Sequence, residues 1–144
     1  MKVQAMLDAK GSEVATTRPD ATIATAIGIL KQEGIGALVV TDPGGELSGI
    51  ISERDIVRGL VDHGGDLLEM PVAELMTRSV KTCGPDHNAN DVMAEMTRSR
   101  IRHLPVLDGG RLCGIISIGD VVKHRLDELE METNVLRDAF ISRQ

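Results

Sequence analysis

The pattern Gly-Ile-Ile-Ser-x-x-Asp occurs twice in this sequence, at residues 49–55 and at residues 114–120. Each copy is typical of a buried strand that leads directly into the first turn of a helix. The junction places a hydroxyl three residues before a carboxylate, and the pairs are Ser52 with Asp55 and Ser117 with Asp120. A helix N-terminus suits a phosphate, and a carboxylate can accept both hydroxyls of a ribose. The repeated junction therefore predicts a site for a phosphorylated ribose.

The same junction has a second interpretation that needs no ligand. Ser-x-x-Asp before an apolar helix resembles a capping box, in which the two side chains bond the free N–H groups of the helix start. Either copy taken alone favours this cap, but nearby cations favour an anion site. Four possible cations fall within six residues of a chain whose formal charge is −6: Arg98, Arg100, Arg102 and His103. Such clustering indicates a local site for an anion, although a solvated basic face remains open for Arg98 and Arg100.

The composition narrows the classes of partner. A chain of 144 residues can form one compact domain or two half-sized units that share a core. Phe140 is the sole aromatic residue among Phe, Tyr and Trp, so the core must be aliphatic and bases cannot stack on aromatic side chains. The acidic balance also argues against binding a polyanion through bulk electrostatics. We therefore expect no nucleic-acid partner.

Cysteine usage and hydropathy bear on the compartment. Cys83 and Cys113 lack the spacing of metal ligands, and free thiols in a reducing cytosol are the simpler interpretation, with a disulfide left open. No stretch reaches the roughly 18 apolar residues of a membrane span, and residues 1–8 lack the apolar core of a signal peptide. We expect a cytoplasmic protein with no membrane contact and no metal site.

Nearly the whole chain is an internal repeat. A short opening helix near residues 3–7 precedes a unit of strand, helix, strand, strand and helix. Its elements are expected at residues 14–17, 23–30, 37–40, 47–51 and 56–61, the last with Ile56, Val57, Leu60 and Val61 on its buried side. The same order returns 66 positions later, or 65 after a shorter turn. This predicts an α/β (α+β) fold of two packed repeats, residues 1–66 and 67–126, and a helical extension, residues 127–144.

The last segment carries a different pattern. Apolar residues recur in steps of four and three with one polar member, and neither glycine nor proline interrupts them; the positions are Val122, Leu126, Leu129, Thr133, Leu136 and Phe140. This heptad pattern predicts a long helix that packs on another surface. A partner subunit and the helix's own chain are equally open as that surface.

The doubled junction, together with His103-Leu104-Pro105-Val106 before a glycine-rich turn, resembles a tandem pair of CBS domains, a Bateman module, of the stand-alone bacterial or archaeal type. The resemblance spans about residues 3–126. It implies a pseudo-two-fold pair with two clefts between its sheets, and a homodimer shaped like a flat disc. It also implies adenosine-containing ligands: AMP, ADP, ATP, NAD(H) or S-adenosylmethionine.

The expected nucleotide contacts combine the resemblance with the reasoning from the residues. The ribose contacts that it implies are Asp55 and Asp120, with Ser52 and Ser117 beside them. The backbone near Thr16, Thr17, Thr82 and Cys83 is expected to read the adenine edge, with Leu38 or Leu104 over its face. The other candidate contacts are Ala37, Arg54, Arg102, His103, Pro105 and Ile118. Because Gly36-Ala37 replaces Arg102-His103 in the first copy, phosphate contacts are in doubt for the first cleft, although Arg102 could serve either one.

The best-supported function from sequence is an adenine-nucleotide-sensing regulatory module without catalysis, for example in energy sensing. Neither a P-loop nor a spacing that suggests a catalytic triad is found. Two alternatives remain: a weak nucleotide-processing enzyme that uses the same pocket, and a structural dimerisation unit with empty clefts.

Overall fold

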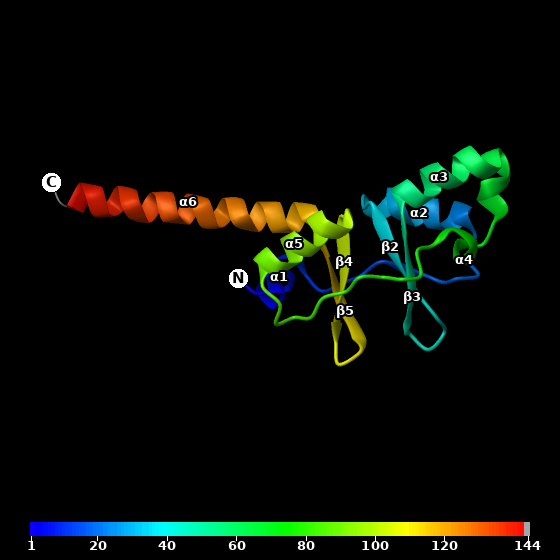
Figure 1. Ribbon diagram of the computed structural model, residues 1–144, viewed down its shortest axis with the longest axis horizontal. Helices are drawn as coiled ribbons and strands as arrows, with labels where there is room; N and C mark the ends of the chain where they lie inside the picture. Colours follow the sequence, from blue (N-terminus) through cyan, green and yellow to red (C-terminus); the bar gives the residue numbers. More distant parts are fainter. Residues whose placement is uncertain (143–144) are drawn as a thin grey trace.

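The computed structural model describes residues 1–142 and shows two small sheets next to each other, with helices packed on them (Figure 1). The elements follow the predicted α/β repeat, and the last helix extends away from the sheets as one continuous rod. In chain order they are α1 (Val3–Lys10), β1 (Thr16–Thr17), α2 (Ile23–Glu33), β2 (Ala37–Thr41), β3 (Leu47–Ser52), α3 (Glu53–His63), the 3-10 helix η1 (Gly64–Glu69), α4 (Val72–Leu75), α5 (Ala89–Ser99), β4 (His103–Asp108), β5 (Arg111–Ser117) and α6 (Ile118–Ser142).

Both sheets are built around an antiparallel pair of strands. In the first half β1 pairs in parallel with β2, and β2 pairs with β3, where Leu38 faces Ile51. In the second half β4 pairs with β5, where Leu104 faces Ile116. These four side chains are fully buried. The inner strands therefore supply the aliphatic core that the composition required.

The strand predicted at residues 80–83 shrinks to a single parallel bridge between Cys83 and Val106. Cys83 N–H donates to the Pro105 carbonyl at 3.0 Å, and Leu107 N–H donates to the Cys83 carbonyl at 2.9 Å. The next bond of a parallel ladder would need an N–H on residue 105, which proline lacks. Pro105 thus ends the pairing that its counterpart Val39 allows in the first half.

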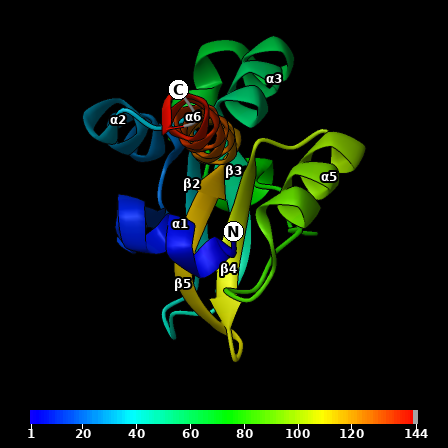
Figure 2. The same ribbon diagram turned by 90° about the vertical axis from the view of Figure 1, so that its left-hand side faces the viewer.

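The two cores exchange short segments across the repeat boundary. Helix α1 packs in the core of the second half, where Val3, Met6 and Leu7 are buried with α5, β4 and β5. In return, Leu67 of η1 and Val72 of α4 pack in the core of the first half. The predicted division at residue 66 follows the repeat along the chain, whereas the cores follow this exchange. Figure 2 shows α1 beside β5, away from α3.

The prediction for the apolar face of α3 was wrong. Ile56 is buried as expected, but Val57, Leu60 and Val61 are exposed, and Val61 is 82% exposed. Gly59 takes the inward position instead, because Leu67 and Leu75 lie where a larger side chain would be. Three of the four apolar side chains predicted to be buried on α3 are therefore exposed in the single chain.

Helix α6 is also open along its heptad positions. Val122, Leu126, Leu129, Leu136 and Phe140 are between 42% and 71% exposed. The start of α6 packs on the chain, where Val121 is buried against the second core. The alternative that the heptad face packs on its own chain therefore does not hold for the described residues. Among these residues no helix is both long and apolar enough to cross a membrane.

Residues 76–77 pack closely against Gly49 of β3, and a substitution at Gly49 tests this contact. A β-carbon at Gly49 would lie 2.7 Å from the Thr77 carbonyl oxygen and 2.9 Å from Met76 Sδ, so the backbone must shift. We expect Gly49→Ala to lower the free energy of unfolding by about 1–3 kcal/mol. The control is Gly28→Ala inside α2, where nothing lies within 4 Å, and it should raise that free energy by roughly 0.5–1 kcal/mol. Urea unfolding measures both, and an equal effect of the two variants would contradict the packing.

Candidate functional site

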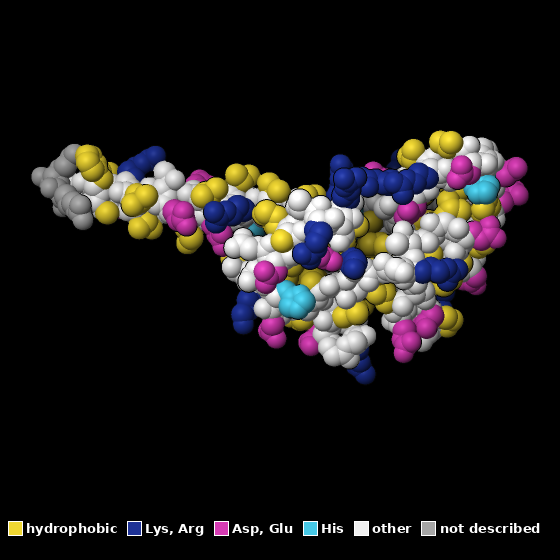
Figure 3. All heavy atoms as spheres, viewed as in Figure 1, with side chains coloured by type: hydrophobic (Ala, Val, Ile, Leu, Met, Phe, Trp, Pro, Cys, Tyr) yellow, Lys and Arg dark blue, Asp and Glu magenta, His cyan; other side chains and the backbone are white. Residues whose placement is uncertain are grey.

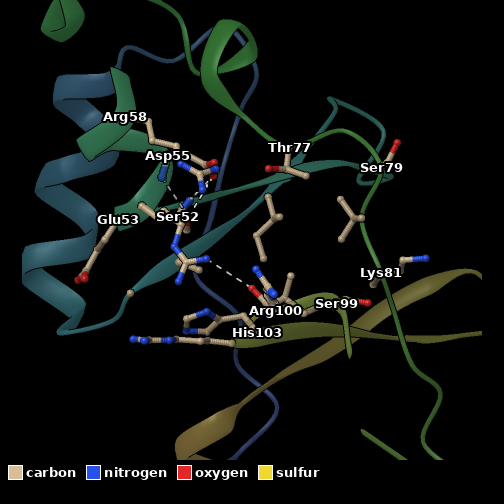
Figure 4. A pocket seen from close by; sticks show the side chains of 17 residues that line it. Ser52, Glu53, Asp55, Arg58, Thr77, Ser79, Lys81, Ser99, Arg100 and His103 are labelled. Atoms are coloured by element: carbon tan, nitrogen blue, oxygen red, sulfur yellow. Dashed lines mark hydrogen bonds between the residues drawn. The ribbon is translucent and has the colours of Figure 1, made fainter. Parts of the chain in front are cut away.

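A cleft of about 600 Å³ lies between the two halves and draws its lining from both. The first half contributes Gly36, Ala37, Ile50, Ser52, Glu53, Arg54, Asp55 and Arg58; the connecting segment contributes Thr77, Ser79, Val80 and Lys81; the second half contributes Ser99, Arg100, Ile101, Arg102 and His103. Figure 4 shows Ser52 and Asp55 on one side, with Arg100 and His103 on the other. A molecule bound here would contact both repeats at once.

The carboxylate of Asp55 is held by the start of its own helix. Asp55 Oδ2 accepts the Ser52 N–H at 2.9 Å and lies 3.1 Å from Ser52 Oγ, which in turn accepts the Asp55 N–H at 3.3 Å. The capping interpretation is therefore confirmed. Within residues 1–142 the hydrogen bonds of this carboxylate all end on Oδ2, so Oδ1 can accept a further hydrogen bond. The cap aims the carboxylate and leaves one oxygen open.

The second junction repeats this geometry and adds a lysine. Asp120 Oδ2 accepts the Ser117 N–H at 2.8 Å, and Ser117 Oγ accepts the Asp120 N–H at 3.1 Å. Lys10 from α1 donates to the same Oδ2 at 2.7 Å. Burial by itself raises the pKa of Asp120, but the hydrogen bonds from Lys10 and Ser117 outweigh burial and hold this pKa below its usual value. Asp120 is therefore an ion-paired carboxylate.

The cations of the second repeat lie in the cleft of the first carboxylate. Arg100, Arg102 and His103 line the same cleft as Asp55. The sequence had placed phosphate contacts in doubt for the first cleft because they were missing from the first copy. In the structure the two copies face each other, so arginines of the second copy line the cleft that holds the first carboxylate. Figure 3 shows lysine and arginine side chains gathered over this junction of the halves.

Arg54 and Arg98 differ in their positions. Arg54 lines the cleft, and its Nη1 donates to the Arg100 carbonyl at 3.4 Å, which ties α3 to the end of α5. Arg98 lies outside this lining, pairs with Glu95 and has a side chain that is 75% exposed. Arg98 is therefore better described as part of a solvated basic face, the alternative that the sequence left open for it.

Arg100 has an unusual backbone conformation. It is the C-cap of α5 with φ 55° and ψ 44°, and it is the sole non-glycine residue with positive φ among residues 1–142. Its counterpart Gly34 caps α2 with φ 64°. Glycine adopts this left-handed conformation without strain, whereas a side chain at such a position costs roughly 1 kcal/mol. Arg100 thus lines the cleft in a backbone conformation that glycine would adopt with less strain.

His103 is a neutral neighbour in this cleft. Burial lowers its pKa, and the charges of Lys10 and Arg102 lower it further, against the opposite influence of Asp120 and Glu53. Its ring packs over Gly36, where an added β-carbon would lie 3.4 Å from Cε1. His103 therefore supplies a hydrogen-bonding ring, and the positive charge of the cleft comes from arginine and lysine.

Several predicted contacts lie outside the lining of the cleft. Leu38, Leu104 and Pro105 are buried inside the sheets, and Thr17 and Cys83 are also buried. Burial raises the pKa of the Cys83 thiol to about 11, and the nearby Cys113 adds to this effect, so the thiol is unreactive. Thr16, Thr82, Ser117, Ile118 and Asp120 are also absent from this lining. Both cysteines are free.

Other lining residues were missed by sequence reasoning. Arg58 lies four residues after Arg54 and three after Asp55, a spacing that places all three on one side of a helix and would have identified it. Thr77, Ser79 and Lys81 belong to the segment between α4 and α5. Because Thr77 exchanges backbone hydrogen bonds with Ile50 at 3.0 and 2.8 Å, the joining segment crosses the cleft. No local signal in the sequence indicates that crossing.

Comparison with known proteins agrees with this architecture. The family model of the CBS domain matches residues 9–62 and 72–127. The chain is 32% identical to the CBS domain-containing protein YhcV of Bacillus subtilis over 119 residues. The aligned part covers 83% of this chain and 84% of that protein. The structure of a CBS-domain-containing protein from Agrobacterium tumefaciens is 45% identical, with a TM-score of 0.84 over 86% of this chain and 92% of that one.

A third similar structure was solved with ligands. It is the CBS domain pair of protein MJ0100, in complex with 5′-methylthioadenosine and S-adenosylmethionine. It is 27% identical to this chain, with a TM-score of 0.80 over 89% of this chain and 98% of that one. The doubled junction, the paired sheets and the two matched stretches lead to one conclusion: the chain belongs to the CBS domain family and contains a tandem pair of CBS repeats.

Proposed function

We propose that the Asp55 cleft binds an adenine nucleotide and that the chain is a non-catalytic regulatory module that senses this ligand in the cytoplasm. The observation that carries the proposal is the convergence of one half-free carboxylate and four arginines on a single cleft between the repeats. In a chain of formal charge −6, this local excess of cations favours a ligand that carries phosphate. The MJ0100 complex supports the adenosine part of the ligand.

Each part of the ligand has residues that suit it. Asp55 Oδ1 is placed to accept the ribose hydroxyls, and Ile50 and Val80 offer apolar contacts for adenine. Arg100 and Arg102 are placed for the phosphates. AMP, ADP, ATP and NAD(H) all carry these three parts. S-adenosylmethionine carries a positive sulfonium and no phosphate, so the arginines disfavour it in this cleft.

The two alternatives from the sequence make different predictions. A weak nucleotide-processing enzyme would convert ATP or NADH during a long incubation with the purified protein, whereas a sensor returns it unchanged. A purely structural unit would bind none of these ligands in a titration. The purely structural alternative gives no reason for the left-handed Arg100.

We also propose that the protein is a homodimer whose subunits meet through α3 and α6. Val57 and Val61 on α3 correspond to Val122 and Leu126 on α6, and all four are exposed. Both repeats therefore present the same apolar face to solvent. Further along α6 the heptad positions continue this face, and Figure 3 shows hydrophobic side chains along the rod. Burial of such faces is a common source of dimer stability.

Removal of the ribose partner tests the nucleotide proposal. Asp55→Ala should weaken binding about ten- to a hundredfold, because a charge-assisted hydrogen bond is worth ~1.5–3 kcal/mol. Asp55→Asn keeps the shape without the charge and should fall between. Calorimetric titration with AMP, ATP, NADH and S-adenosylmethionine measures both variants. Asp62→Ala, at the far end of α3, is the control, and unchanged affinity in Asp55→Ala would show that the residue is only a cap.

A glycine at residue 100 separates binding from stability. Arg100→Gly should weaken ATP binding about tenfold or more while adenosine binding stays the same, because only the phosphates lose a partner. The same change should leave the melting temperature unchanged or higher, since glycine relieves the left-handed strain. Equal losses for ATP and adenosine would argue against a phosphate role.

An acidic residue on the heptad face tests the dimer. Leu126→Asp should convert the dimer to monomer at micromolar concentration, because the carboxylate would be buried between apolar faces. Met131→Asp is the matched control, since Met131 is 70% exposed and lies off the heptad positions. Light scattering after size exclusion gives both masses. If the wild-type protein is already a monomer, the dimer proposal fails.

A further inference from the structure

Charged side chains flank the apolar face of α6 in a regular pattern. The seam of this helix consists of the heptad positions Val122, Leu126, Leu129, Thr133, Leu136 and Phe140. Arg125 and Glu132 each come one residue before a seam position, and Glu130 and Arg137 each come one residue after one. All four charged side chains are exposed. In a two-stranded coiled coil, residues at these flanking positions form the ion pairs between helices that set partner choice and orientation.

The single chain leaves most of these flanking charges without a partner. Arg125 Nη1 donates to Glu128 at 3.2 Å on the same helix. Among residues 1–142, Glu130, Glu132 and Arg137 form no ion pair. The seam and its flanking charges are therefore available to a second molecule.

A second copy of α6 matches these charges when it runs in the same direction and in register. In that arrangement, the residue before a seam position on one chain faces the residue five positions later on the other chain. Arg125 then faces Glu130, and Glu132 faces Arg137. Because the two chains are equivalent, each contact occurs twice, which gives four attractive pairs and no like-charge pair at the flanking positions.

An antiparallel pair of rods also matches charges, but it covers less of the seam. With Arg125 opposite Glu132, the two seams overlap only between Val122 and Thr133, and these two residues face each other. The seam positions nearer the C-terminus then extend past the partner's seam. Parallel pairing covers the whole seam and places Thr133 beside its own copy, and a polar residue at a single seam position helps to specify the register.

The globular part of the chain favours the parallel arrangement as well. Figure 1 shows α3 and α6 along one edge of the molecule, with α6 running away from α3. A two-fold axis along the α6 rods places the two globular parts side by side, so that α3 can meet α3 of the partner. Antiparallel rods would hold the globular parts at opposite ends, and Val57 and Val61 of α3 would stay exposed. Parallel pairing therefore accounts for both apolar faces.

We infer that residues 122–140 of α6 form a parallel, in-register coiled coil with the same residues of a second copy. This inference rests on the proposed homodimer and adds the orientation of its subunits. The coil is about 27 Å long, at a rise of ~1.5 Å per residue. Its apolar seam supplies the contact, and the flanking charges select the same chain in the same direction. The two Asp55 clefts of the dimer then lie at the same end of the coil.

Charge reversal on the rod tests the pairing and its direction. In the full chain, Glu132→Arg should raise the dissociation constant of the dimer about tenfold, because two like-charge pairs with Arg137 replace two attractive pairs. Glu132→Arg combined with Arg137→Glu restores opposite charges and should return that constant to within about threefold of the wild type. Asp138→Arg reverses a charge on the side of the helix away from the seam and is the control, which should leave the constant unchanged. Sedimentation equilibrium measures each protein, and high salt should shrink the effect of the single variant.

The possible failures of this test have different meanings. If the double variant stays as weak as Glu132→Arg, the rods are not parallel, because the new arginine would still face Arg125 of an antiparallel partner. If Glu132→Arg dimerises as tightly as the wild type, the rods do not pair, although a dimer through α3 still stands. A monomeric wild type overturns the homodimer proposal itself. The substituted residues lie on the exposed rod outside both cores, and equal melting temperatures of the repeats confirm that folding is unchanged.

Discussion

The site depends on one hydrogen bond, the bond from the junction serine N–H to the aspartate that begins the following helix. It measures 2.9 Å at Ser52 and 2.8 Å at Ser117, and in both cases it ends on Oδ2. The bond fixes where strand becomes helix and aims the second carboxylate oxygen away from the backbone. Capping and ligand binding are therefore compatible roles of one residue. At Asp55 the cap leaves Oδ1 open for the ligand that we propose.

The two repeats share this junction but differ in the charged side chains that face it. Asp55 faces arginines from the other repeat, whereas Asp120 faces a lysine from α1. The same sequence motif is thus placed in a cationic cleft in one half and in an internal ion pair in the other. Where the copies depart from each other, as Gly34 does from Arg100, the difference affects the cleft more than the core. The positions at which the copies differ change the proposed ligand cleft, whereas the positions that they share form the cores.

The sequence predicted the elements well because their signals are local. Periodicity located α2, β2 and β3, and Gly34 ends α2 in the left-handed conformation that glycine adopts without strain. Contacts between distant segments were not predictable in this way. Lys10 and Asp120 are 110 positions apart, and no periodicity joins them. The same holds for the exchange of α1 between cores, since an amphipathic helix shows which face is buried and not which core buries it.

The apolar face of α3 shows that periodicity does not tell which molecule buries a face. A period of 3.6 marked Val57, Leu60 and Val61 as buried, but the single chain leaves them exposed. Periodicity identifies an apolar face. A second subunit can bury that face as well as the chain's own core can. The cleft connects to this face directly, because Asp55 lies in the first turn of α3 and Val57 and Val61 follow on the same helix. A ligand that holds the N-terminus of α3 acts on the element that carries the proposed dimer contact. Such a ligand changes the dimer only to the extent that its affinity differs between two arrangements of that helix.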